Sequence, residues 1–577
     1  MIIILCKKMD TRKLLSISIK NLFAILILSG VLFSSCGIIG KSKKKYDYSQ
    51  FPQGAILTGD MKDSKTFYLI REDAKKMAGI CFIDDDKAVA EIISFDADST
   101  GSTAFLYGKD VSHGKMVVDQ SSKEVTITLP RISALAIEPQ KIHMNYLDTI
   151  PASADCPEYY KEPVFDNIIA AKNIQYGTAR GYYNSKPSDY ISKEDYRVWF
   201  EEMAKSYRES VIEQGLKALP LHLDIYRPAN NTADKSPLVL FIHGGAFFFG
   251  DKENKLQHIL TDDLVKRGFT VASINYRLGS SLVGAGAIER TIYRDVQDAR
   301  AALRYLIHHR EELGIDEEQV YLAGSSAGGI IALTTAFMDE NEVYTSASQG
   351  FLRLRENLGS LDGSGNDYTD SFNVAGVVSL WGGVTNLQIV NNPIPALLFH
   401  GTNDDIVPNG EGLPFRNAMG NLVHRILSTF GKVYGSQPIY NRLTSLNIPA
   451  KYVPFEGYGH DAHINPDESL NANMDVIREE TAGFLFDHVS KHYFDYQVSG
   501  DTIVGTNGVA PVYQLENPGN TSVRWQVVGG FITNQTNASI RVIWYGATDT
   551  GTVTACITNG NGMSCKKELH VKISYKQ

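Results

Sequence analysis

Residues 320–338 of the sequence are VYLAGSSAGGIIALTTAFM. This stretch begins with a short apolar run typical of a buried strand, passes through Gly-Ser-Ser-Ala-Gly at 324–328, and ends in an apolar run typical of a helix. A GxSxG turn between a strand and a helix predicts a nucleophile elbow, which lifts Ser326 above the edge of a sheet. Gly324 and Gly328 suit so tight a turn, because a Cβ atom at either position would collide with neighbouring backbone.

The surrounding segment, residues 165–493, alternates apolar runs with helical patterns. This alternation predicts a mainly parallel sheet flanked by helices. Seven runs have the pattern of strands, namely Leu221–Tyr226, Leu238–His243, Thr270–Asn275, Gln319–Ala323, Val374–Leu380, Pro395–His400 and Ala450–Pro454. Helices are expected near 256–267, 292–312, 327–338 and 469–491, with a further one over Ser192–Gly215.

Three more strand ends carry chemically useful residues. The small-residue loop His243–Phe247 follows one apolar strand, and two of its backbone N–H groups with that of Ala327 would form an oxyanion hole. An acidic turn, His400–Pro408, follows a second strand, and Gly457–His460 follows a third. The order Ser, Asp, His along the chain is that of the α/β-hydrolases and differs from the chymotrypsin and subtilisin orders.

With these motifs in place, the segment resembles the carboxylesterase and hormone-sensitive-lipase branch of the α/β-hydrolases. Asp224–Pro228 and Asn275–Leu278 fit that branch as well, and the resemblance covers roughly residues 173–493. It implies a triad in which Ser326 is the nucleophile, Asp404 the acid and His460 the base. The fold class expected is therefore α/β, an α/β-hydrolase with further β-rich parts before and after it.

The resemblance also assigns the residues around the triad. The N–H groups of Gly245, Ala246 and Ala327 would bind the oxyanion, with Ala246 standing where the family often has glycine. His243 is expected to hold this loop in place and not to transfer protons. Asp405, next to the expected acid, is interpreted as a solvated turn residue.

The implied activity is hydrolysis of a carboxylic ester through an acyl-enzyme, with no metal or organic cofactor. His460 and His463 have a spacing that suggests metal binding, but no further motif completes a metal site. Two alternatives stay open: a serine peptidase of the prolyl-oligopeptidase type and a non-catalytic binding protein built on an esterase fold. The peptidases usually carry a large repeated propeller, and the region before residue 165 shows no internal repeat.

The substrate is less defined by the sequence. Phe247 and Trp381 follow strand ends, so they are expected either to line the acyl pocket or to pack in the core. By analogy with similar enzymes, the expected partner is a small ester or an acyl group carried on a glycan.

The N-terminus has the pattern of an export signal. Five basic residues precede the apolar run Leu22–Ser35, which is too short for a membrane span. The string Leu32–Cys36 resembles a bacterial lipobox, so we expect residues 1–35 to be removed and Cys36 to be lipidated. Residues 36–45 would form a linker, and the protein would sit in the bacterial cell envelope, periplasmic or surface-exposed, touching the membrane only through its lipid anchor.

Two β-rich segments flank the central one. Residues 46–164 show short alternating runs without an assignable motif, and residues 498–577 predict a small β-sandwich that resembles PKD- or immunoglobulin-like modules. Cys556 and Cys565 flank an Asn-Gly-Asn-Gly turn, so a disulfide across this hairpin is expected.

Composition agrees with a folded, multi-domain protein. The length of 577 residues suggests about three or four domains. Apolar residues make up 43% and charged residues 21%, which argues against disorder and fibrous repeats. The formal charge of −9 would become −13 after loss of residues 1–35, so electrostatics favour neither nucleic acid nor an anionic membrane as a partner.

Overall fold

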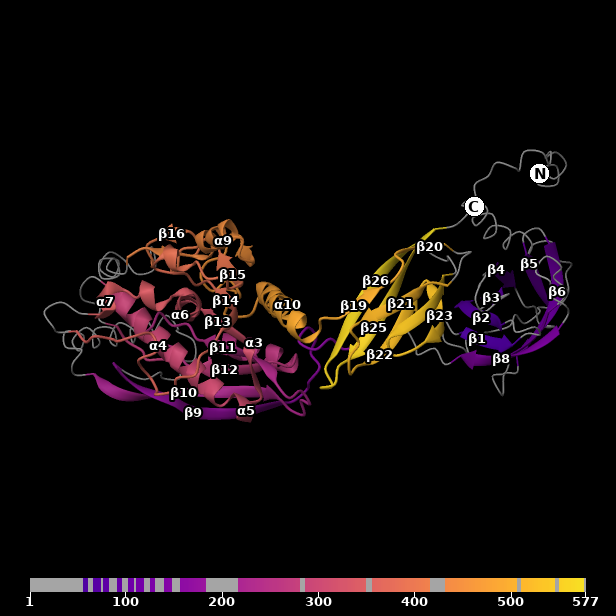
Figure 1. Cartoon of the computed structure of the whole chain (residues 1–577). Helices are drawn as coiled ribbons and strands as arrows, with labels where there is room; N and C mark the ends of the chain where they lie inside the picture. The colour runs from indigo at the N-terminus through magenta and orange to yellow at the C-terminus, as the bar shows by residue number, and fades with distance from the viewer. Residues whose placement is uncertain are drawn as a thin grey trace, which may run out of the picture. The chain divides into compact units, whose positions relative to one another are not determined.

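A computed structural model describes most of the chain from Ile56 onward (Figure 1). The described residues are 56–60, 66–73, 76–81, 91–95, 102–107, 110–118, 125–129, 140–147, 156–182, 216–280, 286–348, 355–415, 431–505, 510–544 and 549–574. The expected signal segment, Cys36 and the expected helix over Ser192–Gly215 lie outside these ranges. None of the described helices is long and apolar enough to cross a membrane.

The chain divides into two compact units. In the first, eight strands close into a barrel in which each strand pairs with the next and the last pairs back with the first. These strands are β1 (Ile56–Asp60), β2 (Thr66–Asp73), β3 (Lys76–Cys81), β4 (Glu91–Phe95), β5 (Ser102–Tyr107), β6 (Asp110–Val118), β7 (Val125–Leu129) and β8 (Gln140–Leu147).

The second unit contains an eight-stranded sheet in the order β18-β15-β14-β13-β11-β12-β10-β9. All pairs from β18 to β12 are parallel, and only β10 and β9 at one edge run antiparallel to their neighbours. Figure 1 shows this sheet running from β9 at the bottom of the view upward to β15. The strands are β9 (Ile168–Gly181), β10 (Lys217–Pro228), β11 (Ser236–Ile242), β12 (Thr270–Ile274), β13 (Ile315–Ser325), β14 (Val374–Leu380), β15 (Ala396–Gly401) and β18 (Ala450–Phe455).

Helices cover both faces of the sheet, which explains why its central strands are apolar throughout. Alternate side chains of β11 belong to different cores. Leu240 lies in the cluster that includes residues of α4, α6 and α9, whereas Phe241 lies in the cluster that includes residues of α3 and α10. The helices are α3 (Lys255–Lys266), α4 (Ala287–His308), α5 (Arg310–Leu313), α6 (Ala327–Phe337), α7 (Thr345–Ser348), α9 (Ser436–Ser445) and α10 (Asn473–Tyr493). Short elements complete the region: η4 (Glu340–Glu342), η6 (Leu387–Ile389), β16 (Glu411–Gly412) and β17 (Val433–Tyr434).

The C-terminal segment forms two four-stranded sheets, in the orders β19-β21-β24-β23 and β20-β26-β25-β22. Their strands are β19 (Gln497–Ser499), β20 (Ile503–Gly505), β21 (Val512–Glu516), β22 (Ser522–Val528), β23 (Gly530–Gln535), β24 (Ser539–Trp544), β25 (Thr550–Thr558) and β26 (Ser564–Ser574). Trp544 is buried in this segment, and its indole N–H donates to the Tyr513 hydroxyl at 3.0 Å.

The expected disulfide between Cys556 and Cys565 is wrong. Cys556 is bonded to Cys156, just before the central sheet, and Cys565 is a buried free thiol. The hairpin register explains this, because Cys565 lies opposite Ile557 and Cys556 lies opposite Lys566. Since neighbouring strand residues point to opposite faces, the two cysteines cannot meet across the hairpin.

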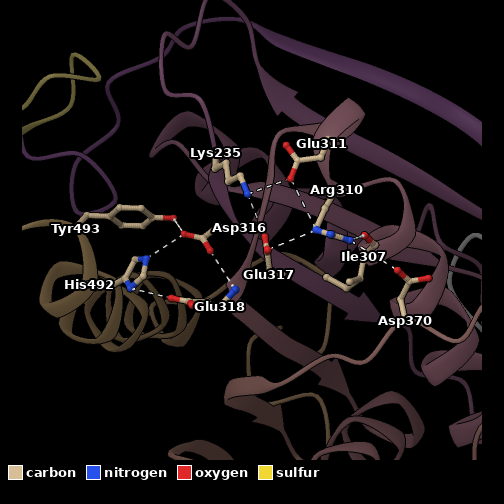
Figure 2. Close-up of polar contacts among 10 residues, drawn as sticks. All are labelled: Lys235, Ile307, Arg310, Glu311, Asp316, Glu317, Glu318, Asp370, His492 and Tyr493. Carbon is tan, nitrogen blue, oxygen red and sulfur yellow. Dashed lines mark hydrogen bonds and ion pairs between the residues drawn. The ribbon is translucent and has the colours of Figure 1, made fainter.

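A polar cluster anchors α10 to the start of β13, at the other end of that strand from Ser326 (Figure 2). The buried Asp316 carboxylate accepts hydrogen bonds from the Tyr493 hydroxyl at 2.5 Å and from His492 Nε2 at 3.1 Å. The backbone N–H of Glu318 donates to its other oxygen at 3.0 Å. This cluster fixes the position of a helix that covers one face of the sheet.

Candidate active site

The nucleophile elbow lies where β13 passes into α6. Ser326 has φ 54° and ψ −121°, a strained conformation for a residue with a side chain. A Cβ on Gly324 would lie 2.3 Å from the Gly328 carbonyl oxygen, and one on Gly328 would lie 2.1 Å from the Ile242 carbonyl oxygen. Glycine is therefore required at both positions, because no side chain fits between the elbow and its neighbours.

Ser326, His460 and Asp404 form a continuous chain of hydrogen bonds. His460 Nε2 lies 2.7 Å from Ser326 Oγ, and His460 Nδ1 lies 2.7 Å from Asp404 Oδ2. The three side chains come from segments that follow β13, β15 and β18, so their meeting depends on the strand order of the sheet. In this geometry the imidazole can take the serine proton while the carboxylate holds the ring in one tautomer.

Asp404, and not Asp405, contacts the imidazole. Its Oδ1 accepts the backbone N–H groups of Ile406 at 2.9 Å and Val407 at 3.0 Å. Burial alone would raise the pKa of the Asp404 carboxyl, but His460 and His400 outweigh burial and hold this pKa well below its usual range. The carboxylate therefore stays ionised beside the imidazole.

His400 is a second histidine on Asp404 that the sequence analysis did not assign. Its Nε2 lies 2.9 Å from the Val407 carbonyl oxygen and 3.2 Å from Asp404 Oδ2, and its Nδ1 lies 2.8 Å from Ser436 Oγ. Because carbonyl and carboxylate oxygens can only accept, Nε2 carries a proton and donates to both. The sequence signal that could have indicated this role is its place at the start of the segment HGTNDD, four residues before Asp404.

The pKa of His460 is set by opposing effects. Burial lowers it, but the Asp404 carboxylate at 2.7 Å outweighs burial and raises the pKa above its ordinary value. Asp461 and Asp405 raise it further at longer range. The site is therefore built to stabilise the imidazolium that forms when the serine loses its proton.

The expected oxyanion loop lies against the elbow. A Cβ on Gly244 would lie 3.2 Å from Ser326 Cβ, and Ala327 is the first residue of α6. Within the described ranges, the backbone N–H groups of Gly245, Ala246 and Ala327 have no hydrogen-bond partner in the protein. Free N–H groups beside a nucleophile are what an oxyanion hole requires.

His243 is built into the support of this loop. Its ring stacks on Tyr276 with centroids 4.3 Å apart, and Nδ1 lies 2.7 Å from the Gly244 carbonyl oxygen, to which it donates. Burial lowers the pKa of His243 to about 4, so the ring is neutral near pH 7. A neutral, buried ring bonded to the backbone is suited to holding the loop and not to proton transfer.

Phe247 and Trp381 are both buried and do not provide an open pocket wall. Phe247 is 4% exposed and packs in the core of the central sheet. Trp381 is fully buried, stacks on His463 at 5.1 Å and presents its ring at 64° to that of His460 at 6.4 Å. Of the two interpretations of these aromatic residues, the structure favours packing.

Nothing among the described residues gathers three side chains that could hold a metal ion. His463 is buried against Trp381, and burial lowers its pKa. A groove of about 1030 Å³ lies at the β9 edge between residues 175–180 and residues 363–368. None of the triad residues lines it, so we do not assign it to the substrate.

A mainly parallel sheet, an elbow after β13 and the chain order Ser, Asp, His together define an α/β-hydrolase fold. Comparison with known proteins agrees, because residues 223–393 match the family model described as BD-FAE.

Relatives and solved structures match the same region. Over 225 residues the chain is 29% identical to a probable isoprenylcysteine alpha-carbonyl methylesterase from Arabidopsis thaliana, covering 35% of this chain and 45% of that protein. Over 106 residues it is 35% identical to Esterase LipI from Mycobacterium tuberculosis, covering 18% of this chain and 29% of that protein. The apo form of Thermogutta terrifontis esterase 2 has a TM-score of 0.33 at 20% identity, covering 47% of this chain and 90% of that one. The chain thus spans less than half the length of these curated relatives.

Proposed function

We propose that this chain is a serine carboxylesterase. The observation that carries the proposal is the hydrogen-bonded chain from Ser326 Oγ through His460 to Asp404, with 2.7 Å at each link. The names of the curated relatives, which are esterases, point the same way.

The reaction follows from these contacts. His460 Nε2 takes the Ser326 proton as Oγ attacks the ester carbonyl carbon, and the C=O π electrons move to oxygen to form a tetrahedral oxyanion. The N–H groups of Gly245, Ala246 and Ala327 bind that oxyanion. As the oxyanion collapses, the alkoxy leaving group takes the proton from His460 and departs as the alcohol, leaving the acyl group on Oγ. His460 then takes a proton from a water molecule, whose oxygen attacks the acyl carbon. The second tetrahedral intermediate collapses, the bond from the acyl carbon to Ser326 Oγ breaks, Oγ regains the proton from His460, and the carboxylic acid leaves.

For the substrate class we propose acyl decorations on glycans or small esters. Support comes from the analogy with similar enzymes and from a relative that is named a probable methylesterase. In this proposal Phe247 and Trp381 do not shape the acyl pocket, because both side chains pack in the core.

We further propose that Cys36 carries a lipid anchor in a bacterial cell envelope and that the C-terminal sandwich is a PKD- or immunoglobulin-like module. The disulfide between Cys156 and Cys556 supports export, because disulfides persist mainly in oxidising compartments. Cys36→Ser should leave the protein either unprocessed or soluble, so that it no longer partitions into the detergent phase. Acyl chains detected by mass spectrometry on that variant would contradict the anchor.

The deciding experiment compares p-nitrophenyl esters with aminoacyl anilides as substrates of the mature protein. We expect the wild-type protein to hydrolyse the ester, and we expect Ser326→Ala to lower kcat for that ester by several orders of magnitude. An organophosphonate should label Ser326, and labelling at Ser325 would show a different elbow register. Preferred cleavage of the anilide would support the peptidase, and no turnover of either would support a non-catalytic binding protein.

A further inference from the structure

The loop that we assign to the oxyanion hole has a backbone that few residues adopt. We define the oxyanion loop as residues 243–252. Gly245 has φ 120°, and the two residues after it, Ala246 and Phe247, have φ 51° and 68°. A left-handed conformation is unfavourable for a residue with a side chain, so contacts around the loop must hold it.

The first half of the loop is held by the segment that follows β12. The Tyr276 hydroxyl donates to the His243 carbonyl oxygen at 3.0 Å. The backbone N–H of Gly279 donates to the Phe247 carbonyl oxygen at 2.9 Å. These bonds fix the entry to the loop and its left-handed turn.

The second half is held by side chains at the end of β12. The Ser273 hydroxyl donates to the Lys252 carbonyl oxygen at 2.7 Å, and the Asn275 amide makes two further bonds. Asn275 Oδ1 accepts the backbone N–H of Lys252 at 2.6 Å, and Asn275 Nδ2 donates to Asp251 Oδ2 at 3.1 Å. The orientation of the amide is unambiguous, because one end faces a donor and the other faces a carboxylate. Asn275 is itself fixed, since its N–H donates to the His222 carbonyl oxygen at 2.9 Å and its carbonyl oxygen accepts the Tyr176 hydroxyl at 2.8 Å.

A buried ion pair ties the same end of the loop to β10. Lys252 Nζ lies 3.0 Å from Asp224 Oδ2, and their side chains are 4% and 0% exposed. Asp224 also accepts the backbone N–H of Asn173 at 2.7 Å. Buried charges are costly unless paired, so any movement of Lys252 away from Asp224 is strongly opposed.

We propose that Asn275 is a positioning residue for the oxyanion hole, acting through Asp251 and Lys252 on the left-handed turn at Gly245–Phe247. The inference rests on the proposed esterase function. If the bond from Asn275 to Asp251 is lost, Asp251 shifts while the ion pair still holds Lys252. The strained turn before Asp251 then relaxes, and the N–H groups of Gly245 and Ala246 lose their alignment beside Ser326. The loss should then appear in the transition state and not in substrate binding.

The test swaps donor and acceptor. Asn275→Asp keeps the shape and the acceptor for Lys252, but it sets a second carboxylate oxygen against Asp251. We expect kcat to fall on the order of 10–100-fold with KM within about threefold, since losing a whole oxyanion donor costs about 10²–10³ in kcat. Adding Asp251→Asn restores a donor–acceptor pair in the reverse direction and should recover kcat to within about fivefold of wild type. The control is Asn391→Asp, because Asn391 makes a similar contact with Glu342 at 2.9 Å on the surface.

All kcat values are taken per active site titrated with an organophosphonate, so that misfolded protein does not count. Unchanged kcat in Asn275→Asp, or no recovery in the folded double variant, would overturn the positioning role while leaving the esterase proposal intact. Absence of wild-type ester turnover would overturn both. Should Asn275→Asp fail to fold, Asp251→Asn alone carries the test. In this variant the amide of Asn275 faces a second amide at position 251, and the two match only in part. We expect kcat to fall by a larger factor than KM changes, and an unchanged kcat would reject the proposal.

Discussion

At the scale of single residues, the acid of the triad is the sharpest prediction. Asp404→Asn should lower kcat/KM by about 10³–10⁴, because an amide at that position favours the wrong imidazole tautomer. Asp405→Asn should change it by less than about threefold, since Asp404 is the one of these two carboxylates that is hydrogen-bonded to His460. Steady-state kinetics on both variants checks this, and the reverse ranking would exchange their roles.

The pH dependence of the same site follows from the direction of the His460 shift. The base must be neutral, and its raised pKa means that kcat/KM should fall, as pH is lowered, at a higher pH than an ordinary histidine would give. Removing the Asp404 charge leaves burial as the main effect, so Asp404→Asn should move this acid limb to lower pH. A pH profile of the residual activity decides it, and a limb that stays in place would assign the titration to another group.

At the scale of elements, the polar cluster around Asp316 at the start of β13 should contribute to stability and not to catalysis. Burial, followed by the neighbouring Tyr160 and Asp316, raises the pKa of Tyr493, so its hydroxyl remains a donor to the carboxylate. Tyr493→Phe should lower the free energy of unfolding by about 1–3 kcal/mol with unchanged kcat. Denaturant unfolding measures this, with Tyr496→Phe as a matched control. Equal stability of the two variants would show that Asp316 is satisfied without Tyr493.

Element boundaries also show where pattern reading succeeds and fails. The predicted strand Val374–Leu380 coincides with β14, because a strand buried on both faces is a continuous apolar run. Strand β9 was not predicted. Its exposed edge position permits polar residues and glycine, and it is a strand because it pairs along β10.

At the scale of the whole molecule, the disulfide joins parts that are 400 residues apart in sequence. Non-reducing peptide mapping should recover a linked pair of peptides containing Cys156 and Cys556, with Cys565 alkylated only after denaturation. The double variant Cys156→Ser, Cys556→Ser should lose about 2–4 kcal/mol of stability, a typical disulfide contribution, and keep ester turnover. A linked peptide containing Cys565 would contradict the pairing.

The fold class and the residues expected in the triad could be predicted from local patterns in the sequence. These depend on local signals: an elbow needs small residues between a strand and a helix, and each motif ends its own apolar run. Three contacts could be seen only in the folded chain: the bond between Cys156 and Cys556, the packing of Trp381 beside His460, and the hydrogen bond between Asn275 and Lys252. These contacts join segments that are distant in sequence. They depend on the order and register of the strands, and packing of the whole sheet fixes both.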